Sequence, residues 1–498
     1  MEHFDVLIMG AGLSGIGAAH HLNQLCPGKS YVILEQRERI GGTWDLFRYP
    51  GIRSDSDMLT MGYSFRPWTM PRAISPGEDI RNYITDAARE EGIDKHIRFR
   101  HQITRASWSS DVARWTVEAE CEGKPVELTC GFLFSCAGYY RYSSGYTPDF
   151  PGVSRFMGPV VHPQIWPEDL DYAGKRVVII GSGATAVTLL PSMAETAAHV
   201  TMLQRSPTYI VSAPAKDPVA TWLRDHLPSR LAYTLSRWKN ILFTASLYQV
   251  SQRFPDFMKK RILDKVREEL PAGYDVDTHF APSYKPWEQR MCLVPDADMF
   301  GAIKSGKASV VTDQIETITE TGILLKSGKM LEADVLVTAT GLVMQGFGGI
   351  TLSVDGRVVE PAKTLAYKGV MFSGVPNLAT VFGYINASWT LKADLICNYV
   401  CRMLNVMDAK SAKQVMPVSG DETPIAPFVE NFSSGYMKRA LESWPRQGRS
   451  SPWRVYQNYF QDIIALKWKP VDDRGLEFSS PAVKPVKAEA PELAQAAK

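Results

Sequence analysis

The feature that most constrains this chain is a glycine-rich turn between a buried strand and a helix. The apolar run 5–9 predicts a strand, and residues 16–25 favour a helix. The turn between them reads Gly10-Ala11-Gly12-Leu13-Ser14-Gly15, and a second apolar run, 31–34, is followed by Glu35. Strand, glycine turn, helix, strand and acid, in this order, are typical of the βαβ unit that binds a dinucleotide.

Each residue of the turn has a physical role under this hypothesis. Gly10 permits the tight turn, Gly12 lets the backbone approach a pyrophosphate, and Gly15 lets the helix pack closely on the strand. The free N–H groups at the helix N-terminus would bind the phosphates, with Ser14 among the binding residues. The carboxylate of Glu35 would accept hydrogen bonds from ribose hydroxyls.

A second unit of the same form begins about 170 residues later. A strand is expected at 176–180, a helix towards residue 193 and another strand at 199–203, with cofactor-binding candidates in the turn Gly181, Ser182, Gly183, Ala184, Thr185 and Ala186. The last strand is followed by Gln204-Arg205-Ser206 in place of an acid. A guanidinium and a hydroxyl bind a 2′-phosphate that a carboxylate would repel, so we expect NADP here, held by Arg205 and Ser206. The first site is expected to hold FAD or NAD.

Composition excludes several classes of protein. The 498 residues suggest about three domains, and 55 Lys and Arg against 53 Asp and Glu give a net charge of +2, so no nucleic-acid partner is indicated. The seven cysteines include no CxxC pair, which disfavours a disulfide scaffold and a metal site. With no secretory signal and no apolar run long enough to span a membrane, we expect a cytoplasmic protein.

Residues 215–270 differ from the rest of the chain. Leu227, Leu231, Leu235, Trp238 and Leu242 recur at helical spacing, and eleven Lys and Arg against six Asp and Glu give this stretch a charge of +5. We interpret it as a helical insertion. One hypothesis is a packed helical cap with a solvated face; the other is a patch that contacts a membrane surface or gates an apolar substrate.

The expected fold class is α/β, with two Rossmann-like dinucleotide-binding domains and this helical insertion. Further strands are expected at 131–138, 307–312 and 330–338. We assign residues 1–140 and 336–478 to an FAD-binding domain and residues 150–213 and 285–335 to an NADP-binding domain. The insertion covers 214–284, and residues 479–498, rich in Pro, Ala and Lys, are expected to be a disordered tail.

Two longer motifs separate the possible activities. The stretch from Gly41 to Asp55 reads GGTWDLFRYPGIRSD, and the stretch from Phe156 to Pro167 reads FMGPVVHPQIWP. They match the GGxWxxxx(F/Y)PGxxxD and FxGxxxHxxxW-P/D fingerprints, so residues 1–470 resemble the Baeyer–Villiger monooxygenases, which are class B flavin monooxygenases. Residues 48–58 and 383–392 are similar to the bacterial branch that activates the thioamide prodrug ethionamide.

The resemblance implies that NADPH reduces FAD and that O2 then gives a C4a-peroxyflavin, which converts ketones to esters or lactones. Sulfides and thioamides are further expected substrates, and short or medium aliphatic ketones are favoured. One alternative is a flavin monooxygenase that oxidises N or S atoms, although such enzymes carry an aromatic and a basic residue where this chain has Trp166-Pro167. Others are an NADPH oxidase or flavin reductase, and a nucleotide-sensing protein without catalysis.

The resemblance also implies roles for single residues. Arg290 would stabilise the anionic peroxide and the developing oxyanion, and Asp55 would orient Arg290. Trp44 would pack against the flavin edge, and the backbone of Ile103 would hold the adenine. Further expected cofactor contacts in the first fingerprint are Gly42, Thr43, Arg53 and Ser54. Relatives place a Lys that contacts the 2′-phosphate where this chain has Gln289.

Three other residues receive structural interpretations. Asp57 is expected to cap a helix that begins at Met58. His162 and Trp166 are expected in a linker between the domains, away from the ketone. His279 carries no functional hypothesis.

Overall fold

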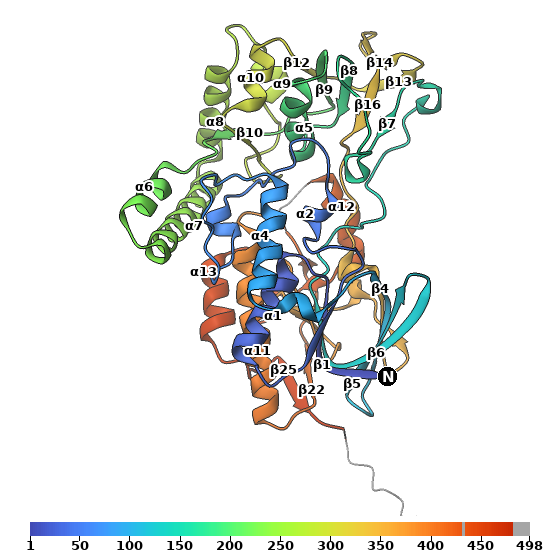
Figure 1. Ribbon diagram of the computed structural model, residues 1–498, viewed down its shortest axis with the longest axis vertical. Helices are drawn as coiled ribbons and strands as arrows, with labels where there is room; N and C mark the ends of the chain where they lie inside the picture. Colours follow the sequence, from blue (N-terminus) through green and yellow to red (C-terminus); the bar gives the residue numbers. More distant parts are fainter. Residues whose placement is uncertain (431–433, 482–498) are drawn as a thin grey trace, which may run out of the picture.

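The computed structural model describes residues 1–430 and 434–481. Figure 1 shows two sheet-containing parts along the long axis of the molecule, with the chain passing between them more than once. A nine-stranded sheet forms the core of the lower part, and a five-stranded sheet forms the core of the upper part. This arrangement confirms the expected α/β fold class.

The first sheet is built around β1, which pairs in parallel with both β2 and β6. Its order is β18-β17-β4-β5-β6-β1-β2-β3, with β21 paired to β6. The strands are β1 (Glu2–Met9), β2 (Tyr31–Leu34), β3 (Ile97–Arg98), β4 (His101–Ser109), β5 (Arg114–Cys121), β6 (Lys124–Ser135), β17 (Thr351–Val354), β18 (Arg357–Val358) and β21 (Leu378–Thr380). Strands β1 and β2 become almost wholly buried towards their carboxyl ends, as expected for parallel strands covered on both faces.

Helices cover this sheet and begin close to its carboxyl edge. Helix α1 (Leu13–Leu25) packs along α11 (Trp389–Ala409) and also contacts α4 (Gly77–Glu90). Two short helices, α2 (Thr43–Leu46) and α3 (Met58–Met61), lie within and just after the first fingerprint. Asp57 accepts a hydrogen bond from the Thr60 N–H at 2.9 Å, so it caps α3.

The second sheet is parallel throughout, in the order β12-β9-β8-β16-β7. Its elements are β7 (Val160–Val161), β8 (Arg176–Ile180), α5 (Ala184–Ala194), β9 (His199–Gln204), α10 (Asp298–Lys304), β12 (Ala308–Thr312) and β16 (Val335–Thr338). An antiparallel meander of β13 (Ile315–Thr319), β14 (Gly322–Leu325) and β15 (Met330–Glu332) precedes β16.

The strand expected at 330–338 is two strands in different sheets. Ala333 donates its N–H to the Thr321 carbonyl, at the end of the meander, whereas the N–H of Asp334 already bonds Arg176 of β8. The chain therefore changes sheets at this point. Because β16 pairs with β8, the chain leaves the second sheet after Thr338, a few residues beyond the expected 335.

Four helices separate β10 (Ile210–Ala213) from β11 (Cys292–Pro295), which pair in parallel. They are α6 (Pro218–His226), α7 (Ser229–Arg253), α8 (Pro255–Glu269) and α9 (Val276–Phe280). Helices α6 and α7 project from the left side of the molecule in Figure 1. None of the helices within the two described ranges is long and apolar enough to cross a membrane.

Helix α7 packs on the protein with one side and exposes the other, and the exposed side carries the apolar residues. Ala232, Tyr233, Ser236, Arg237 and Ile241 are its buried residues near the first sheet's helices. The apolar stripe faces solvent instead: Leu231, Leu235, Trp238 and Leu242 are all exposed, and Leu227 lies outside α7. Arg237 lies on the inward side, where its guanidinium donates to the carbonyls of Leu59 and Gly62, which follow the first fingerprint.

The C-terminal region completes the lower part. It contains β19 (Ala366–Tyr367), β20 (Met371–Phe372), β22 (Gln414–Pro417), β23 (Ala426–Pro427), α12 (Gly435–Ala440), β24 (Arg446–Gln447), α13 (Tyr459–Asp462), a π-helical turn η7 (Ile463–Trp468) and β25 (Leu476–Ser479). Ser479 pairs in β25, and the Ser480 hydroxyl bonds Ser411, so the start of the expected disordered tail is ordered. Residues 482–498 of that tail lie outside the described residues.

Candidate active site between the two sheets

The first glycine turn is held by close backbone contacts. Gly10 has a φ of +95°, and a Cβ atom on Gly15 would lie 1.9 Å from the Gly10 carbonyl oxygen. Gly12 is the N-cap of α1 and lies against Gly42, where a Cβ atom would meet its Cα at 3.4 Å. The turn therefore brings the N–H groups of α1 to the carboxyl edge of β1 with no side chain in front of them.

Glu35 directly follows β2 and is only 3% exposed. It accepts hydrogen bonds from the N–H of Ala11 at 2.7 Å and from the N–H of Arg37 at 2.9 Å. Burial raises the pKa of its carboxyl group above the ordinary value. Two N–H donors leave part of the carboxylate's acceptor capacity free for ribose hydroxyls.

A cavity of about 560 Å³ lies along this edge and extends to the second sheet's unit. Most of the sequence-predicted residues line it: Gly10, Gly12, Ser14, Glu35, Gly42, Thr43, Trp44, Arg53, Ser54, Asp55, Ile103, Ala184, Thr185 and Arg290. The others lie outside its lining: Gly15, Gly181, Ser182, Gly183, Ala186, Arg205 and Ser206. The cavity is thus shared by both units but is mainly walled by the first.

Asp55 and Arg290 meet in the wall of this cavity. The Arg290 Nε lies 2.6 Å from the Asp55 Oδ2, and each side chain is about one-third exposed, at 34% and 35%. The charge of Asp55 raises the pKa of Arg290 above its already high ordinary value. The residues are 235 positions apart, and the structure brings them together as the resemblance implies.

Two tyrosines beside Arg290 were missed by the sequence analysis. The Tyr140 hydroxyl donates to the Tyr139 hydroxyl at 2.7 Å, and both residues line the cavity. Tyr139 stacks on Trp389, whose indole N–H donates to the Ser14 hydroxyl at 2.8 Å. Burial raises the pKa of both tyrosines, so both stay protonated as donors. The signal available in the sequence was an aromatic pair directly after the small-residue turn that ends β6.

Ion pairs at Asp45 and at Arg53 hold the loop of the first fingerprint in place. Asp45 is 2% exposed and accepts from the guanidinium groups of Arg37 and Arg48, each at 2.8 Å. Arg53 forms an ion pair with Asp298 at the start of α10. The Arg53 side chain, which was expected to contact the cofactor, therefore also contacts the unit of the second sheet.

The same fingerprint also packs against the second sheet's unit without charges. Gly51 has a φ of +74°, and a Cβ atom there would lie 1.9 Å from the Ser192 hydroxyl of α5. Leu46, Phe47 and Tyr49 belong to the hydrophobic core of the second sheet. The fingerprint is therefore part of the seam between the two units.

Ser54 and Ile103 occupy different parts of the cavity wall. Ser54 is buried, and its hydroxyl accepts from the Ser75 N–H at 3.0 Å, so this side chain holds the loop beside Asp55. Ile103 lies in β4 next to a bulge and is partly buried.

The second glycine turn is more open. A Cβ atom on Gly181 would meet the Ala339 carbonyl oxygen at 2.2 Å, whereas one on Gly183 would meet nothing within 4 Å. Ala186 is fully buried against the strand behind it. Arg205 and Ser206 are exposed after β9, and the Ser206 carbonyl accepts from the Ser182 hydroxyl at 3.2 Å. The turn and the two expected phosphate-binding side chains thus share one exposed edge.

The second fingerprint contributes the edge strand β7 to the second sheet and lies away from the cavity. The His162 Nδ1 accepts from the Gln164 N–H at 3.1 Å, and its Nε2 lies 3.1 Å from the Gly341 carbonyl. Burial lowers the pKa of this imidazole. Trp166 packs against the core of the second sheet. Neither residue lines the cavity, which agrees with the expected place in a linker.

The fold and the site define a protein with two dinucleotide-binding units that open onto one cavity. The model of the flavin-binding monooxygenase-like family matches residues 5–416, so the chain belongs to that family.

Individual relatives agree with this membership. The chain is 54% identical over 480 residues to the FAD-containing monooxygenase EthA of Mycolicibacterium smegmatis, covering 96% of this chain and 97% of the relative. It is 50% identical over 488 residues to the putative FAD-containing monooxygenase MymA of Mycobacterium tuberculosis, covering 97% and 98%. Among solved structures, steroid monooxygenase bound to NADP has a TM-score of 0.72 at 21% identity, covering 96% of this chain and all of that chain, 100%.

Proposed function

We propose that this protein uses FAD, NADPH and O2 to convert ketones to esters or lactones, and that it also oxidises sulfides or thioamides. The observation that carries the proposal is the ion pair of Asp55 and Arg290 in the wall of a cavity that is lined by the first glycine turn and by Ala184 and Thr185 of the second. The fingerprints, the family and the FAD-containing relatives support it.

The residues present fit FAD on the side of the nine-stranded sheet. The Gly10–Gly15 turn and Gly42 leave the N–H groups of α1 clear for a pyrophosphate, and Glu35 stands where a ribose would lie. The cavity continues from this turn past Trp44 to Arg290. When bound there, FAD would supply activated oxygen after reduction by NADPH.

Arg290 would provide the fixed positive charge that the oxygen transfer needs. Its guanidinium stays protonated because Asp55 raises its pKa, and Asp55 holds the Nε so that the two terminal nitrogens remain available. A preorganised cation lowers the energy of a negative charge that develops on oxygen in the transition state. The Tyr139 hydroxyl, which accepts from Tyr140, would donate its own hydrogen to the same region.

We place NADP on the five-stranded sheet. The open turn at Gly183 would admit the pyrophosphate, and Arg205 with Ser206 would bind the 2′-phosphate at the exposed end of β9. On this proposal the FAD domain comprises residues 1–140 and the chain that follows β16, and the helices between 214 and 284 are an insertion in the NADP domain.

The test is turnover with isotope-labelled oxygen. The purified FAD-loaded protein is mixed with NADPH, ¹⁸O2 and a methyl ketone of medium length, and the products are identified by mass spectrometry. We expect an ester that carries one labelled oxygen atom. Consumption of NADPH with hydrogen peroxide as the product, and no labelled ester across a series of ketones, would contradict the proposal.

A parallel reaction with a methyl sulfide separates the two oxygenation chemistries. A labelled sulfoxide together with a labelled ester supports the proposal as stated. A labelled sulfoxide without any ester would assign the protein to the enzymes that oxidise sulfur or nitrogen atoms. Peroxide alone in both reactions would indicate an NADPH oxidase.

A further inference from the structure

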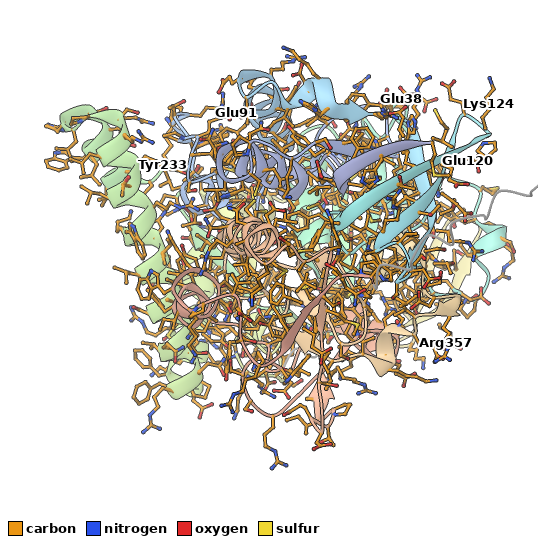
Figure 2. The ribbon with its side chains drawn as sticks, turned by 90° about the horizontal axis from the view of Figure 1, so that it is seen from below. Glu38, Glu91, Glu120, Lys124, Tyr233 and Arg357 are labelled. Atoms are coloured by element: carbon orange, nitrogen blue, oxygen red, sulfur yellow. The ribbon has the colours of Figure 1, made fainter. Side chains whose placement is uncertain are left out.

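The outward face of α7 carries an apolar stripe that the fold leaves uncovered. Leu231, Leu235, Trp238 and Leu242 are between 42% and 52% exposed, and Phe243 beside them is 67% exposed. The buried residues of α7, such as Tyr233 and Arg237, lie on the opposite side of the helix. In Figure 2, α7 runs along one edge of the molecule, with Tyr233 near the side that faces the body.

Neighbouring elements carry further exposed apolar residues. On α6, Trp222 is 58% exposed. On the other side of α7, the Trp238 ring lies 6.3 Å from that of Tyr459 in α13, which is followed by the exposed Phe460. Helices α6, α7 and α13 all lie on the left side of Figure 1. Single exposed apolar residues are common on proteins, but several along one face of a helix, with others on neighbouring helices, indicate an interaction surface.

The charge around this stripe is positive. Residues 215–270 carry +5, whereas the whole chain carries only +2, so the remainder of the protein is slightly acidic. Exposed basic residues lie near the stripe on α7, at Arg230 and Arg253. After α13, the exposed Trp468 stands between the exposed Lys467 and Lys469. Aromatic and aliphatic side chains with Lys and Arg beside them are typical of helices that lie in the plane of a membrane interface.

We propose that α6, α7 and the α13–η7 segment dock on the surface of an anionic lipid bilayer, with the apolar stripe inserted among the lipid headgroups. The charge distinguishes this partner from a second copy of the chain. A symmetric dimer through the stripe would bring together two copies of α6 and α7, each copy with five Lys and Arg against one Asp, while anionic lipid complements that charge.

The position of α7 gives the docking a functional consequence. On the side of α7 away from solvent, Ile241 packs with Tyr384 and Leu391. Tyr384 in turn lines the cavity that contains Arg290. One helix therefore separates the cavity from the proposed lipid surface, and an apolar substrate dissolved in the bilayer would reach the protein on this side.

The test is vesicle flotation with the FAD-loaded full chain. Vesicles of phosphatidylglycerol and phosphatidylcholine in equal amounts are compared with vesicles of phosphatidylcholine alone, in moderate salt. We expect at least tenfold stronger binding to the anionic vesicles. The double variant Leu235→Glu/Leu242→Glu should lower that binding at least tenfold, and the single variant Phe243→Glu should lower it severalfold.

A matched control places the same charges elsewhere. Val112, in the turn between β4 and β5, and Val358, in β18, are 53% and 63% exposed, so Val112→Glu/Val358→Glu should bind vesicles as the unchanged protein does. Bound FAD and circular dichroism verify folding, and Phe243→Glu decides the matter if the double variant misfolds. Equal binding to both vesicle types, or loss of binding in the control variant alone, would overturn the proposal. So would a dimer, seen by ultracentrifugation, that Leu235→Glu/Leu242→Glu dissociates while no vesicle binding occurs. The assay needs no turnover, so its failure is separate from a failure of the proposed oxygenation.

Discussion

The two glycine turns have the same backbone design but different surroundings. In the first turn, Gly15 lies so close to Gly10 that no side chain fits, whereas the corresponding position of the second turn is the buried Ala186. Glu35 after the first unit is almost fully buried and holds two backbone N–H groups. Arg205 after the second is exposed.

This difference matches two kinds of ligand. A cofactor that stays bound through many turnovers is served by a closed, preorganised turn, because little has to be ordered when it binds. A nucleotide that must bind and leave is served by an open edge with a long charged side chain. We therefore infer that the first unit holds its nucleotide more tightly than the second, and the following predictions test that comparison.

The largest effect is expected at Arg290, which stands between the two units. Replacement by alanine should leave FAD bound and still reducible by NADPH, but should lower the yield of oxygenated product by about 100- to 1,000-fold, because the transition state loses its fixed cation. Stopped-flow absorbance follows the reduction, and mass spectrometry measures the product. Normal ester yields from Arg290→Ala would remove this residue from the reaction.

The next largest effect is expected at the last residue of each glycine turn, Gly15 in the first and Ala186 in the second. Gly15→Ala places a Cβ atom 1.9 Å from the Gly10 carbonyl oxygen and should lower the free energy of unfolding by about 1–3 kcal/mol, with loss of bound FAD. Ala186→Gly creates no clash and should cost only about 0.5–1 kcal/mol, from helix propensity. Thermal unfolding and the ratio of FAD to protein measure both. Equal effects would show that the two turns are not packed differently.

Glu35→Gln should weaken FAD binding by roughly tenfold or more, because a hydrogen bond from a ribose to a carboxylate is worth about 1.5–3 kcal/mol. The dissociation constant is obtained by fluorescence titration of the apoprotein with FAD. Glu38→Gln is the matched control, since Glu38 lies on the surface 3.2 Å from Arg100. A change of similar size in both variants would argue against a specific contact at Glu35.

Arg205→Ala should raise the KM for NADPH by about tenfold, because one exposed ion pair with the 2′-phosphate is lost. The KM for NADH should stay almost unchanged, because NADH has no 2′-phosphate. Steady-state oxidation of the two nucleotides, with FAD content held constant, makes the comparison. An equal increase for NADPH and NADH would reject the 2′-phosphate contact.

The smallest effect concerns His162 in the linker. Burial lowers the pKa of this imidazole below its ordinary value of 6.5, so its neutral form contributes stability above that pH. The contribution is lost as the pH falls through the lowered value. His162→Gln should therefore make the free energy of unfolding less dependent on pH between 7.5 and 5. Identical pH dependence of chemical unfolding in both proteins would contradict this assignment.

Local patterns predicted much of the fold. The strands 31–34 and 176–180 were predicted at their observed bounds, because short apolar runs next to glycine turns leave few alternatives. The run 330–338 was wrong as a single strand, since the change of sheet at Asp334 depends on hydrogen bonds to Arg176, which is remote in sequence.

The stripe of α7 shows a second limit. Periodicity indicated a helix there, but the side that packs inward is decided by Arg237 and its carbonyl partners, not by the leucines. A buried arginine that binds main-chain carbonyls has no periodic signature. In the site, the resemblance related Asp55 to Arg290, while nothing in their spacing could. Tyr139 and Tyr140 could have been chosen as candidates because they directly follow the strand end at Gly138. Their contacts with each other and with Trp389 could not be predicted from the sequence.

The contacts of the first fingerprint with the second sheet have a mechanical consequence. Gly51 sits against Ser192 of α5, Arg53 is tied to Asp298 of α10, and Asp55 follows two residues later. The loop is thus attached to the upper part of the molecule at Gly51 and Arg53, and two residues later its Asp55 contacts the guanidinium of Arg290. A rotation of the five-stranded sheet against the nine-stranded sheet would therefore move Asp55 relative to the cavity. Binding of a nucleotide at one site would then displace the Arg290 guanidinium, which is the charge that faces the reacting oxygen at the other site.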